Sequence, residues 1–322
     1  MTKISINLLT YNGEKYLKNC FNSILGQNYK NFALLVIDNN SSDNSVEIIK
    51  KFETKFAEKQ INFRFIQNKE NLGFAKGHNQ AIKLSNSKYV LVLNQDLILD
   101  KNYLKKMIDF MGSHPKCGSA TGKILRLTNG QKTDIIDSLG IKILRNFRAV
   151  DSESGKKDNN KIINNQKIFG VSATCPLYRR KALESIKIDQ DYFDSDFHSY
   201  KEDIDLAFRL KKVGWKSYLI PDAKAWHNRT ASGNEQNKNF EIIKNRKQKS
   251  NFINYNSYKN HLFVLVKNIT LSDLFKNFPF IFWYEFKKFI YIILFEPKSL
   301  KALREFFKKL PKMIKKRKII MK

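Results

Sequence analysis

The first third of the chain repeats a pattern of a short apolar segment followed by an amphipathic stretch. Residues 4–9, 32–37 and 61–66 are rich in Ile, Leu, Val and Phe, and a helix-like segment follows each of them after a few polar residues. Such alternation is typical of strands joined by helices, which form parallel sheets. The sequence therefore predicts an α/β fold with a mainly parallel central sheet.

A fourth apolar segment carries an acid at its carboxyl end. Residues 89–93 lead directly into Asn94, Gln95 and Asp96. Ligands of open α/β sheets bind beyond the carboxyl ends of the strands, so Asp96 is a candidate binding group. Asx residues also close strands as ordinary turns, and the segment alone leaves both roles open.

Further polar motifs follow the other apolar segments in a fixed order. Thr10-Tyr11-Asn12 follows the first, residues 37–43 (Ile-Asp-Asn-Asn-Ser-Ser-Asp) the second, and Asn71-Leu72-Gly73-Phe74-Ala75 the third, while residues 200–206 (Tyr-Lys-Glu-Asp-Ile-Asp-Leu) and His227 come after Asp96. In this order and spacing the chain, to about residue 230, resembles the family 2 nucleotide-sugar glycosyltransferases with the GT-A fold. Within them it resembles the rhamnosyltransferase-like branch. The resemblance implies inverting transfer of a sugar, rhamnose in that branch, from a UDP- or dTDP-sugar to an acceptor hydroxyl.

The resemblance also implies which residues bind the donor. Asp38 matches the acid that accepts from the pyrimidine imide N–H, although it could instead be a turn acid before a helix capped by Ser42 or Asp43. Thr10 and Tyr11 match positions that line the base and ribose, and Tyr11 could equally be a core aromatic. The full set of expected nucleotide-sugar contacts is Thr10, Tyr11, Asn12, Asp38, Asn40, Asn71, Gly73, Gly77, Asn94 and Asp96.

The same resemblance predicts a divalent metal. Asp96 matches the last acid of the family's metal motif, whose usual first acid is replaced here by Asn94. Oxygen ligands of this kind suit Mg²⁺ or Mn²⁺, which offsets the charge developing on a diphosphate leaving group. His227 could be a further ligand or a purely structural histidine.

Two neighbouring acids are candidates for the catalytic base, Glu202 and Asp203. Ser199 and Glu202 have the spacing of a capping box, which would occupy Glu202 with the backbone. Asp203 is then the expected base, and the resemblance favours the same position. The alternative is an acidic first helical turn that is merely solvated.

The segment between the two halves of the expected site is less informative. Residues 128–167 predict a loop or hairpin near the acceptor side, and residues 169–178 predict a strand returning to the sheet. Arg179 and Arg180 could meet a phosphate or simply end that strand in solvent.

Composition narrows the class of protein. The chain has 322 residues, of which 42% are hydrophobic and 13% aromatic, which indicates a folded protein. Its three cysteines form neither a paired framework nor a zinc motif, and no signal-peptide pattern is present at the start, so we expect a reducing, cytoplasmic setting. The dinucleotide-binding and Walker glycine motifs are absent from the sequence, which argues against hydride transfer and P-loop chemistry.

The last quarter of the chain differs from the rest. Residues 241–322 contain 20 Lys or Arg against five Asp or Glu, about half of the net charge of +29. Charged residues interrupt the aromatic segment 277–296 too often for it to span a bilayer. On a helix, one arc of that segment collects its large apolar residues, and a second stripe follows at spacings of three and four. The arc comprises Phe278, Phe282, Trp283, Phe286, Phe289, Ile290, Ile293 and Leu294, and the stripe comprises Leu300, Leu303, Phe307, Leu310 and Ile314.

These patterns predict two domains, a GT-A domain over 1–235 and a basic helical tail over 236–322. We expect the tail, with its polybasic residues 315–318, to bind the anionic inner face of the cell membrane, where the acceptor would be a glycan or a polyprenyl diphosphate-linked glycan. The tail could instead pack on the catalytic domain and present a solvated cationic face, and nucleic acid is a weaker alternative. A sugar nucleotidylyltransferase and a non-catalytic adaptor on a decayed transferase core are the competing functions.

Overall fold

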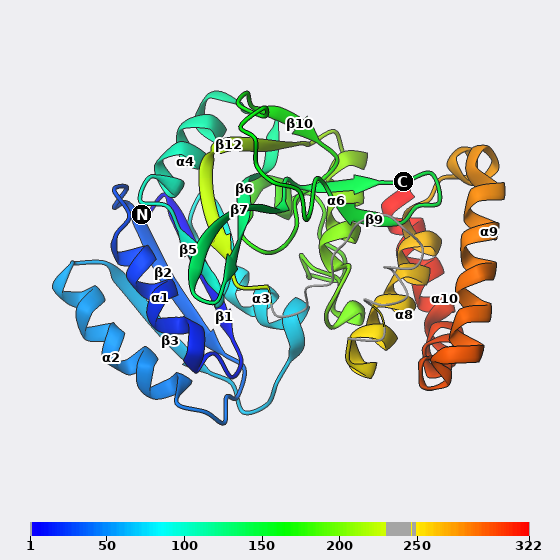
Figure 1. Ribbon diagram of the computed structural model, residues 1–322, viewed down its shortest axis with the longest axis horizontal. Coiled ribbons are helices and arrows are strands. Elements are labelled where there is room, and N and C mark those ends of the chain that lie inside the picture. Colours follow the sequence, from blue (N-terminus) through cyan, green and yellow to red (C-terminus); the bar gives the residue numbers. More distant parts are fainter. Residues whose placement is uncertain (1, 230–245, 247–248, 322) are drawn as a thin grey trace.

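The computed structural model describes residues 2–229, 246 and 249–321. A ten-stranded mixed sheet forms the centre of the molecule, with the path β10-β12-β6-β11-β4-β1-β2-β3; β5 also pairs with β12 and β7 with β6 (Figure 1). Its strands are β1 (Ile4–Thr10), β2 (Phe32–Asp38), β3 (Asn62–Gln67), β4 (Tyr89–Asn94), β5 (Leu97–Leu99), β6 (Cys117–Thr128), β7 (Gln131–Ser138), β10 (Gln166–Ile168), β11 (Leu177–Arg179) and β12 (Lys216–His227). A separate hairpin pairs β8 (Ile141–Ile143) with β9 (Ala149–Asp151).

The first four strands confirm the parallel arrangement expected from the sequence. Strands β4, β1, β2 and β3 are adjacent and parallel, and each begins and ends within one residue of the predicted segment. Helices cover both faces of the sheet. They are α1 (Glu14–Leu25), α2 (Ser45–Glu58) and α4 (Tyr103–Ser113) on one face, and α3 (Gly73–Lys83), α5 (Arg180–Glu184) and α6 (Glu202–Lys212) on the other.

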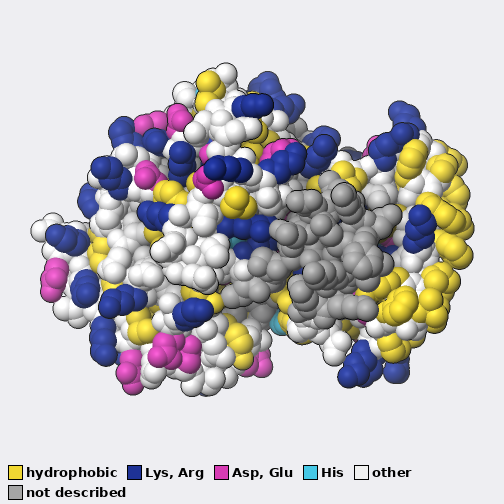
Figure 2. Space-filling model, viewed as in Figure 1, with side chains coloured by type: hydrophobic (Ala, Val, Ile, Leu, Met, Phe, Trp, Pro, Cys, Tyr) yellow, Lys and Arg dark blue, Asp and Glu magenta, His cyan; other side chains and the backbone are white. Residues whose placement is uncertain are grey.

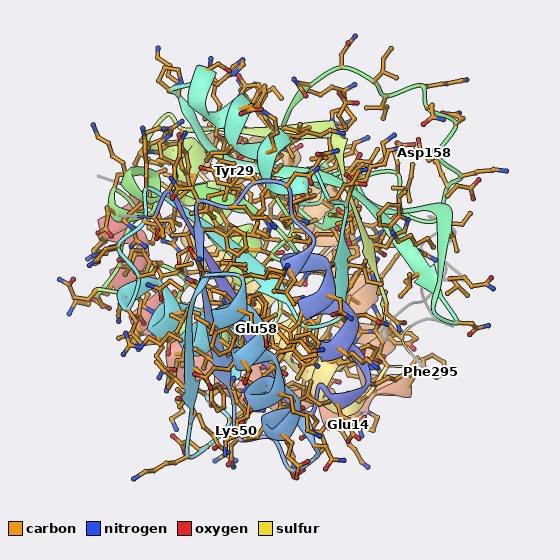
Figure 3. The ribbon with its side chains drawn as sticks, turned by 90° about the vertical axis from the view of Figure 1, so that its left-hand side faces the viewer. Glu14, Tyr29, Lys50, Glu58, Asp158 and Phe295 are labelled. Atoms are coloured by element: carbon orange, nitrogen blue, oxygen red, sulfur yellow. The ribbon has the colours of Figure 1, made fainter. Side chains whose placement is uncertain are left out.

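The outer layer of α1 and α2 also shows how the first helices begin. Figure 3 faces this layer, with Glu14 at the start of α1. The carboxylate of Asp43 accepts from the backbone N–H of Glu14 at 3.0 Å and of Ser45 at 3.0 Å. The residue before α2 is Asn44, so the prediction of Ser42 or Asp43 as its cap was wrong, because Asp43 instead ties the starts of both helices together.

The strand predicted to return to the sheet over 169–178 is much shorter in the structure, where β11 spans Leu177–Arg179. Only β11 pairs with the sheet there, antiparallel to both β4 and β6, while β10 lies at the far edge of the sheet. Arg179 and Arg180 neither face solvent nor are free for a phosphate. Arg179 is buried and donates to the carbonyls of Cys117 and Met111, and Arg180 donates to the carbonyl of Ser87.

The C-terminal helices form a layer beside α6, away from the parallel half of the sheet. They are α8 (Asn251–Asn268), α9 (Leu271–Phe295) and α10 (Lys301–Met321), with a 3-10 turn η2 (Pro297–Leu300) before the last. Helix α8 packs on α6 and on α10, and α9 lies at the outer edge of the molecule (Figure 1). The proposed boundary at residues 235 and 236 lies outside the described residues.

Both predicted tail helices exist, but the large apolar residues of α9 face outward and not into a core. All eight residues of the predicted arc on α9 are exposed, by 38% to 65%. Figure 2 shows hydrophobic side chains gathered along this edge of the molecule. On α10 the buried residues are Ala302, Met313 and Lys316. Of the predicted apolar stripe, Leu300 and Leu303 pack against a buried cluster around Tyr258, whereas Phe307 and Ile314 are 64% and 42% exposed.

The polybasic end is only partly a free cationic cluster. Lys316 is buried and its ammonium bonds Asp196 at 2.6 Å, and Arg317 donates to the carbonyl of Val266 at 2.7 Å. Half of the cluster predicted over residues 315–318 is therefore committed to packing α10 on the rest of the molecule. The residues on either side of this pair, Lys315 and Lys318, are exposed. None of the helices in the described part of the chain is long and apolar enough to cross a membrane.

Candidate functional site

Three of the expected donor-binding residues stand side by side at the carboxyl ends of the parallel strands. Thr10 pairs with Asp38 across β1 and β2, and Leu9 pairs with Asn94 across β1 and β4. This register follows from the apolar segments, because each strand buries its alternating Ile, Leu and Val side chains against helices on both faces. The polar ends of the segments then fall on one edge of the sheet, where α/β proteins bind ligands.

Asp38 is fully buried in this row. Its carboxylate accepts from the backbone N–H of Ser41 at 3.0 Å and from the Ser41 hydroxyl. These bonds give Asp38 the turn-forming role that the sequence left open, and they fix its carboxylate at the strand end. Contact with a pyrimidine stays a prediction, and it would require Ser41 to share the carboxylate with the base.

The loop after β1 is held by polar contacts across the strand ends. Asn12, with a left-handed backbone (φ 49°), accepts from the backbone N–H of Ser42 at 2.9 Å. Gln95 accepts from the Thr10 hydroxyl and from the backbone N–H of Tyr11, while the Tyr11 ring is 48% exposed. Tyr11 is thus not a core aromatic, and its ring is available at the surface of the site.

The loop before α3 has the glycines it needs. Gly73 has φ +76°, and a Cβ atom there would lie 2.3 Å from Nδ1 of His198. At Gly77 a Cβ would lie 2.6 Å from a methyl group of Leu9, so this glycine lets α3 pack against β1. Asn71 accepts from the Gly73 N–H at 2.9 Å, which makes it a turn residue, and Asn40 is exposed with φ 67°. Their contacts with a nucleotide sugar stay predictions.

Asp96 and His227 meet although they lie far apart in the sequence. Strand β12 pairs antiparallel with β5, which places His227 opposite Leu97. Nε2 of His227 lies 3.3 Å from Oδ2 of Asp96, and its Nδ1 bonds Oδ2 of Asp137 at 2.7 Å. Asp137 is buried and also accepts from Arg229 at 3.0 Å. The sequence placed Asp137 in a family-like segment, a loop or hairpin near the acceptor side, and nothing in it indicated that Asp137 would bond His227.

The charges of this triad are strongly coupled. Burial by itself would lower the pKa of His227, but its bonds to Asp137 and Asp96 outweigh burial and raise that pKa to about 9. Burial would likewise raise the pKa of Asp137, yet the bonds from His227 and Arg229 hold it below its usual range. In the absence of a metal, the histidine is therefore a cation between two carboxylates.

The triad also fits a divalent metal. The carboxylate of Asp96 faces one nitrogen of the His227 imidazole, and the carboxylate of Asp137 bonds the other. A carboxylate on the second nitrogen is the usual support of a metal-binding histidine. No group of three or more His, Cys, Asp or Glu able to hold an ion occurs in the described part of the chain. Asp96 and His227 would thus supply two ligands, leaving the remaining positions to diphosphate oxygens and water, as is common for Mg²⁺ and Mn²⁺.

The capping box expected at the start of α6 is not formed. Glu202 is the first residue of the helix, and the residue before it, Lys201, has a left-handed backbone. The hydroxyl of Ser199 instead accepts from the backbone N–H of Phe74 at 3.3 Å. The predicted capping box of Ser199 and Glu202 was therefore wrong, because a turn with three residues of positive φ, His198, Tyr200 and Lys201, rather than a capping serine, leads into the helix.

The two acids of α6 have different surroundings. Glu202 is 5% exposed and its Oε2 has no hydrogen-bond partner among the described residues. Burial, with the neighbouring charge of Asp203, raises the pKa of Glu202 well above its usual range. Asp203 is half-buried, and its carboxylate accepts from the N–H groups of Ala173 at 3.1 Å and Ile204 at 2.8 Å. Burial also raises the pKa of Asp203, although these bonds oppose the effect.

One loop joins the two halves of the site. Asp203 bonds the N–H of Ala173, and the next residue, Thr174, accepts from the N–H of Asn94 at 3.2 Å. The start of α6 is therefore fixed next to the end of β4 and the Asn94–Asp96 segment. The candidate base Asp203 and the candidate metal ligand Asp96 are thus held at the same end of the sheet.

The arrangement defines a class of protein, a GT-A-like α/β fold with a polar site at the carboxyl ends of its strands. Residues 5–187 match the model of the family "Glycosyl transferase family 2". That match covers more than half of the chain, and the chain belongs to this family.

Individual relatives agree with this assignment. A poly-beta-1,6-N-acetyl-D-glucosamine synthase of Staphylococcus epidermidis is 27% identical over 227 residues, which are 69% of this chain and 49% of that protein. The chain thus spans about half the length of the curated relatives it matches. The crystal structure of S. aureus TarS 1-349 in complex with UDP-GlcNAc has a TM-score of 0.58 at 19% identity, covering 97% of this chain and 82% of that one. A structure of GalNAc-T7 with UDP, GalNAc and Mn²⁺ has a TM-score of 0.62 at 11% identity, covering 83% and 49%.

These comparisons refine the expectation drawn from the sequence. They support family 2 and the GT-A-like fold. The staphylococcal synthase is named for N-acetylglucosamine and the TarS structure contains its UDP form, whereas neither name mentions rhamnose. The rhamnosyltransferase-like branch is therefore not the assignment they favour.

Proposed function

We propose that this protein is an inverting, metal-assisted transferase that moves N-acetylglucosamine from UDP-N-acetylglucosamine to a hydroxyl of a cell-surface glycan. The observation that carries the proposal is the meeting of Asp96, His227 and Asp137 at the strand ends, with Asp203 bonded to the loop that also bonds Asn94. The donor preference comes from the relatives named above. dTDP-rhamnose, expected from the sequence pattern, is the alternative donor.

In the proposed reaction the chain's own residues orient the donor and take up a proton. Asp96 and His227 would hold a divalent metal, which offsets charge on the departing diphosphate. Asp203 accepts the proton of the acceptor hydroxyl while the hydroxyl oxygen forms a bond to the anomeric carbon, and the bond from that carbon to the diphosphate breaks. Because this is one displacement, the configuration at the anomeric carbon inverts.

The geometry supports Asp203 over Glu202 as the base. Asp203 is held by two backbone N–H groups and is the more exposed of the two, whereas Glu202 is buried beneath the turn. Asp203→Asn should slow transfer by at least about 10²-fold, with donor affinity unchanged. Glu202→Gln is the matched control. If only Glu202→Gln slowed transfer by this much, Glu202 and not Asp203 would be the base.

Titration calorimetry with a panel of donors tests the function directly. UDP-N-acetylglucosamine, UDP-glucose, dTDP-rhamnose and GDP-mannose are compared with Mn²⁺, with Mg²⁺ and with chelator. We expect UDP-N-acetylglucosamine with metal to bind most tightly. If no pyrimidine nucleotide bound under any condition, the transferase proposal would be wrong, and the adaptor alternative would gain support. Preferred binding of dTDP-rhamnose would restore the branch expected from the sequence.

We further propose that α9 docks on the inner face of the cell membrane. Its exposed aromatic arc lies beside exposed cations such as Lys276, Lys287 and Lys298, a combination that suits an anionic lipid interface. Two of the charges that interrupt the segment 277–296, Glu285 and Lys288, point inward instead. Glu285 bonds His261 at 2.7 Å, and Lys288 lies over the ring of Tyr258. A membrane-anchored acceptor such as a polyprenyl diphosphate-linked glycan would then share the surface with the site.

A further inference from the structure

The turn that leads into the catalytic helix is built from unfavourable backbone conformations. His198, Tyr200 and Lys201 have φ angles of 61°, 73° and 68°. Residues with side chains rarely adopt this left-handed region, and a turn that contains three of them must be stabilised by contacts from elsewhere. Such strain is common where a structure has to hold a functional group in place, and Glu202 and Asp203 follow directly.

The stabilising contact comes from the C-terminal helices. Asn260, at the middle of α8, is fully buried, and its amide nitrogen lies 2.8, 2.9 and 2.7 Å from the carbonyl oxygens of Phe197, Ser199 and Tyr200. Two N–H bonds are thus shared among three carbonyls of one turn. The Oδ1 atom of Asn260 has no hydrogen-bond partner among the described residues. All hydrogen bonds that the Asn260 amide donates therefore go to the turn.

The opposite side of the turn rests on the loop that precedes α3. The backbone N–H of Ala75 donates to the carbonyl of His198 at 3.0 Å, and the imidazole of His198 fills the space that a side chain at Gly73 would need. The turn is therefore clamped between the expected donor loop and α8. Its exit fixes Asp203, whose carboxylate bonds Ala173.

We propose that Asn260 is a positioning residue for sugar transfer, holding the turn that sets Asp203 in its place beside the donor site. The inference rests on the proposed transferase function and on Asp203 as the base. Asn260 itself touches no reacting group. It lies beyond residues 5–187, which match the family model, so this part of the machinery comes from the C-terminal helices.

The test compares two buried asparagines of the same helix. Asn256, one turn earlier, is 2% exposed, and its amide donates to the carbonyl of Phe252 within α8 at 3.1 Å. Both Asn260→Ala and Asn256→Ala remove a buried amide. We expect only Asn260→Ala to lower kcat, by about 10- to 100-fold, with the KM for the donor changed less than about twofold, because a small displacement of the base costs this much.

A pH profile separates positioning from simple loss of stability. Opening the turn would hydrate the carboxyl groups of Glu202 and Asp203, whose burial raises their pKa. In Asn260→Ala the acidic limb of kcat/KM should therefore move to lower pH, and in Asn256→Ala it should stay where it is in the unmodified protein.

Hydrogen exchange gives a readout that needs no acceptor. In Asn260→Ala the amides of Ala75 and Ala173, which bond the turn and Asp203, should exchange faster than in Asn256→Ala. Asn260→Asp, equal in size but unable to donate, should behave at least as badly as Asn260→Ala. Asn260→Ser, which keeps a short donor, replaces the alanine variant if that variant does not fold.

Two results would overturn the inference. One is Asn260→Ala with the kcat, pH profile and exchange of the unmodified protein; the other is Asn256→Ala with the same defects as Asn260→Ala. If the unmodified protein transferred sugar from no donor, the proposed function would fail instead. The exchange comparison would then still decide whether Asn260 holds the turn.

Discussion

The interiors of the sheet and of the C-terminal helices differ in polarity, because α8 buries charged and amide groups beside apolar residues such as Phe263 and Val264. Around the sheet, Ile, Leu, Val and Phe fill the interior and polar groups gather at the strand ends. In the C-terminal layer, α8 buries Lys259, Asn260, His261 and Lys267, while the aromatic arc of α9 faces outward. A stable surface helix normally turns its apolar stripe to the core. The C-terminal layer therefore combines polar bonds in its interior with an exposed aromatic face, which is the face proposed above to meet lipid.

The buried ions of the C-terminal layer join it to α6, which carries the candidate base. Lys267, fully buried, bonds Asp194 and lies 2.7 Å from Oδ1 of Asp205, one helical turn after Glu202. Asp205 also bonds Arg209 at 2.9 Å. Buried charges of this kind add little net stability but define one arrangement, since each partner is costly to leave alone. These ion pairs tie α8 to α6, so we expect the two regions to unfold together.

The largest expected effect concerns the polar strand ends. Asp96→Ala should lower kcat/KM for transfer by about 10³-fold or more, because a metal-held diphosphate is worth several kcal/mol in the transition state. Chelator should inhibit the unmodified protein strongly and the variant hardly at all. Asp109→Ala, which removes an exposed acid of α4, is the control. Full activity in Asp96→Ala would mean that Asp96 does not hold a metal needed for transfer.

The next effect concerns the polar interior of the C-terminal layer. Lys267→Met removes the buried cation that Asp194 and Asp205 share and leaves them with Lys316 and Arg209 as their remaining charged partners. The loss should lower the free energy of unfolding by about 3–5 kcal/mol. Lys105→Met, which breaks an exposed ion pair with Asp109, should cost less than about 1 kcal/mol. Urea denaturation measures both. Equal, small losses would mean that the two regions fold independently, and a chain ending near residue 240 would then be viable.

A smaller effect is expected from the exposed face of α9. Replacing Phe282, Trp283 and Phe286 together by Ser should leave the free energy of unfolding nearly unchanged, since all three are at least 46% exposed. Binding to phosphatidylglycerol vesicles, measured by flotation at low and high salt, should fall at least about tenfold, because each aromatic ring loses the apolar area it buries in lipid.

The control variant replaces three exposed apolar residues that lie outside α9. Leu84, Ile163 and Val213 are 41%, 64% and 52% exposed and lie apart from α9 in the sequence. Replacing these three by Ser should leave vesicle binding intact. If unmodified protein ignored anionic vesicles at low salt, the aromatic face would have to serve a protein partner instead.

The smallest expected effect lies at the border of the two regions. Glu202→Gln removes a buried carboxyl whose pKa burial raises, so the wild-type residue stabilises the fold only while protonated, and this contribution is lost as pH rises through its folded-state pKa. The variant should therefore gain stability relative to the unmodified protein between pH 5 and pH 8, by urea denaturation. A constant loss of stability at all pH values would restore the capping role expected from the sequence.

Local pattern was sufficient for the parallel half of the fold. The apolar segments ending at Leu9, Ile37 and Leu93 specify strands whatever surrounds them, because alternating burial and helix-forming neighbours act within a few residues. The order of polar motifs at their ends likewise sufficed to recognise the family and to locate Asp96 on the sheet edge. The arc on α9 was also readable, since helical periodicity alone decides which side chains share a face.

The sequence could not show which groups far apart along the chain would meet. The bond of His227 to Asp137, the clamp of Asn260 on the turn before Glu202, and the burial of Lys316 against Asp196 each join residues separated by more than 50 positions. Ser199 and Glu202 had the spacing of a capping box, but the packing of that turn between α3 and α8 imposed another conformation. Spacing fixes local bonds only while nothing stronger competes, and here the tertiary contacts that hold the turn before Glu202 and Asp203 were the stronger.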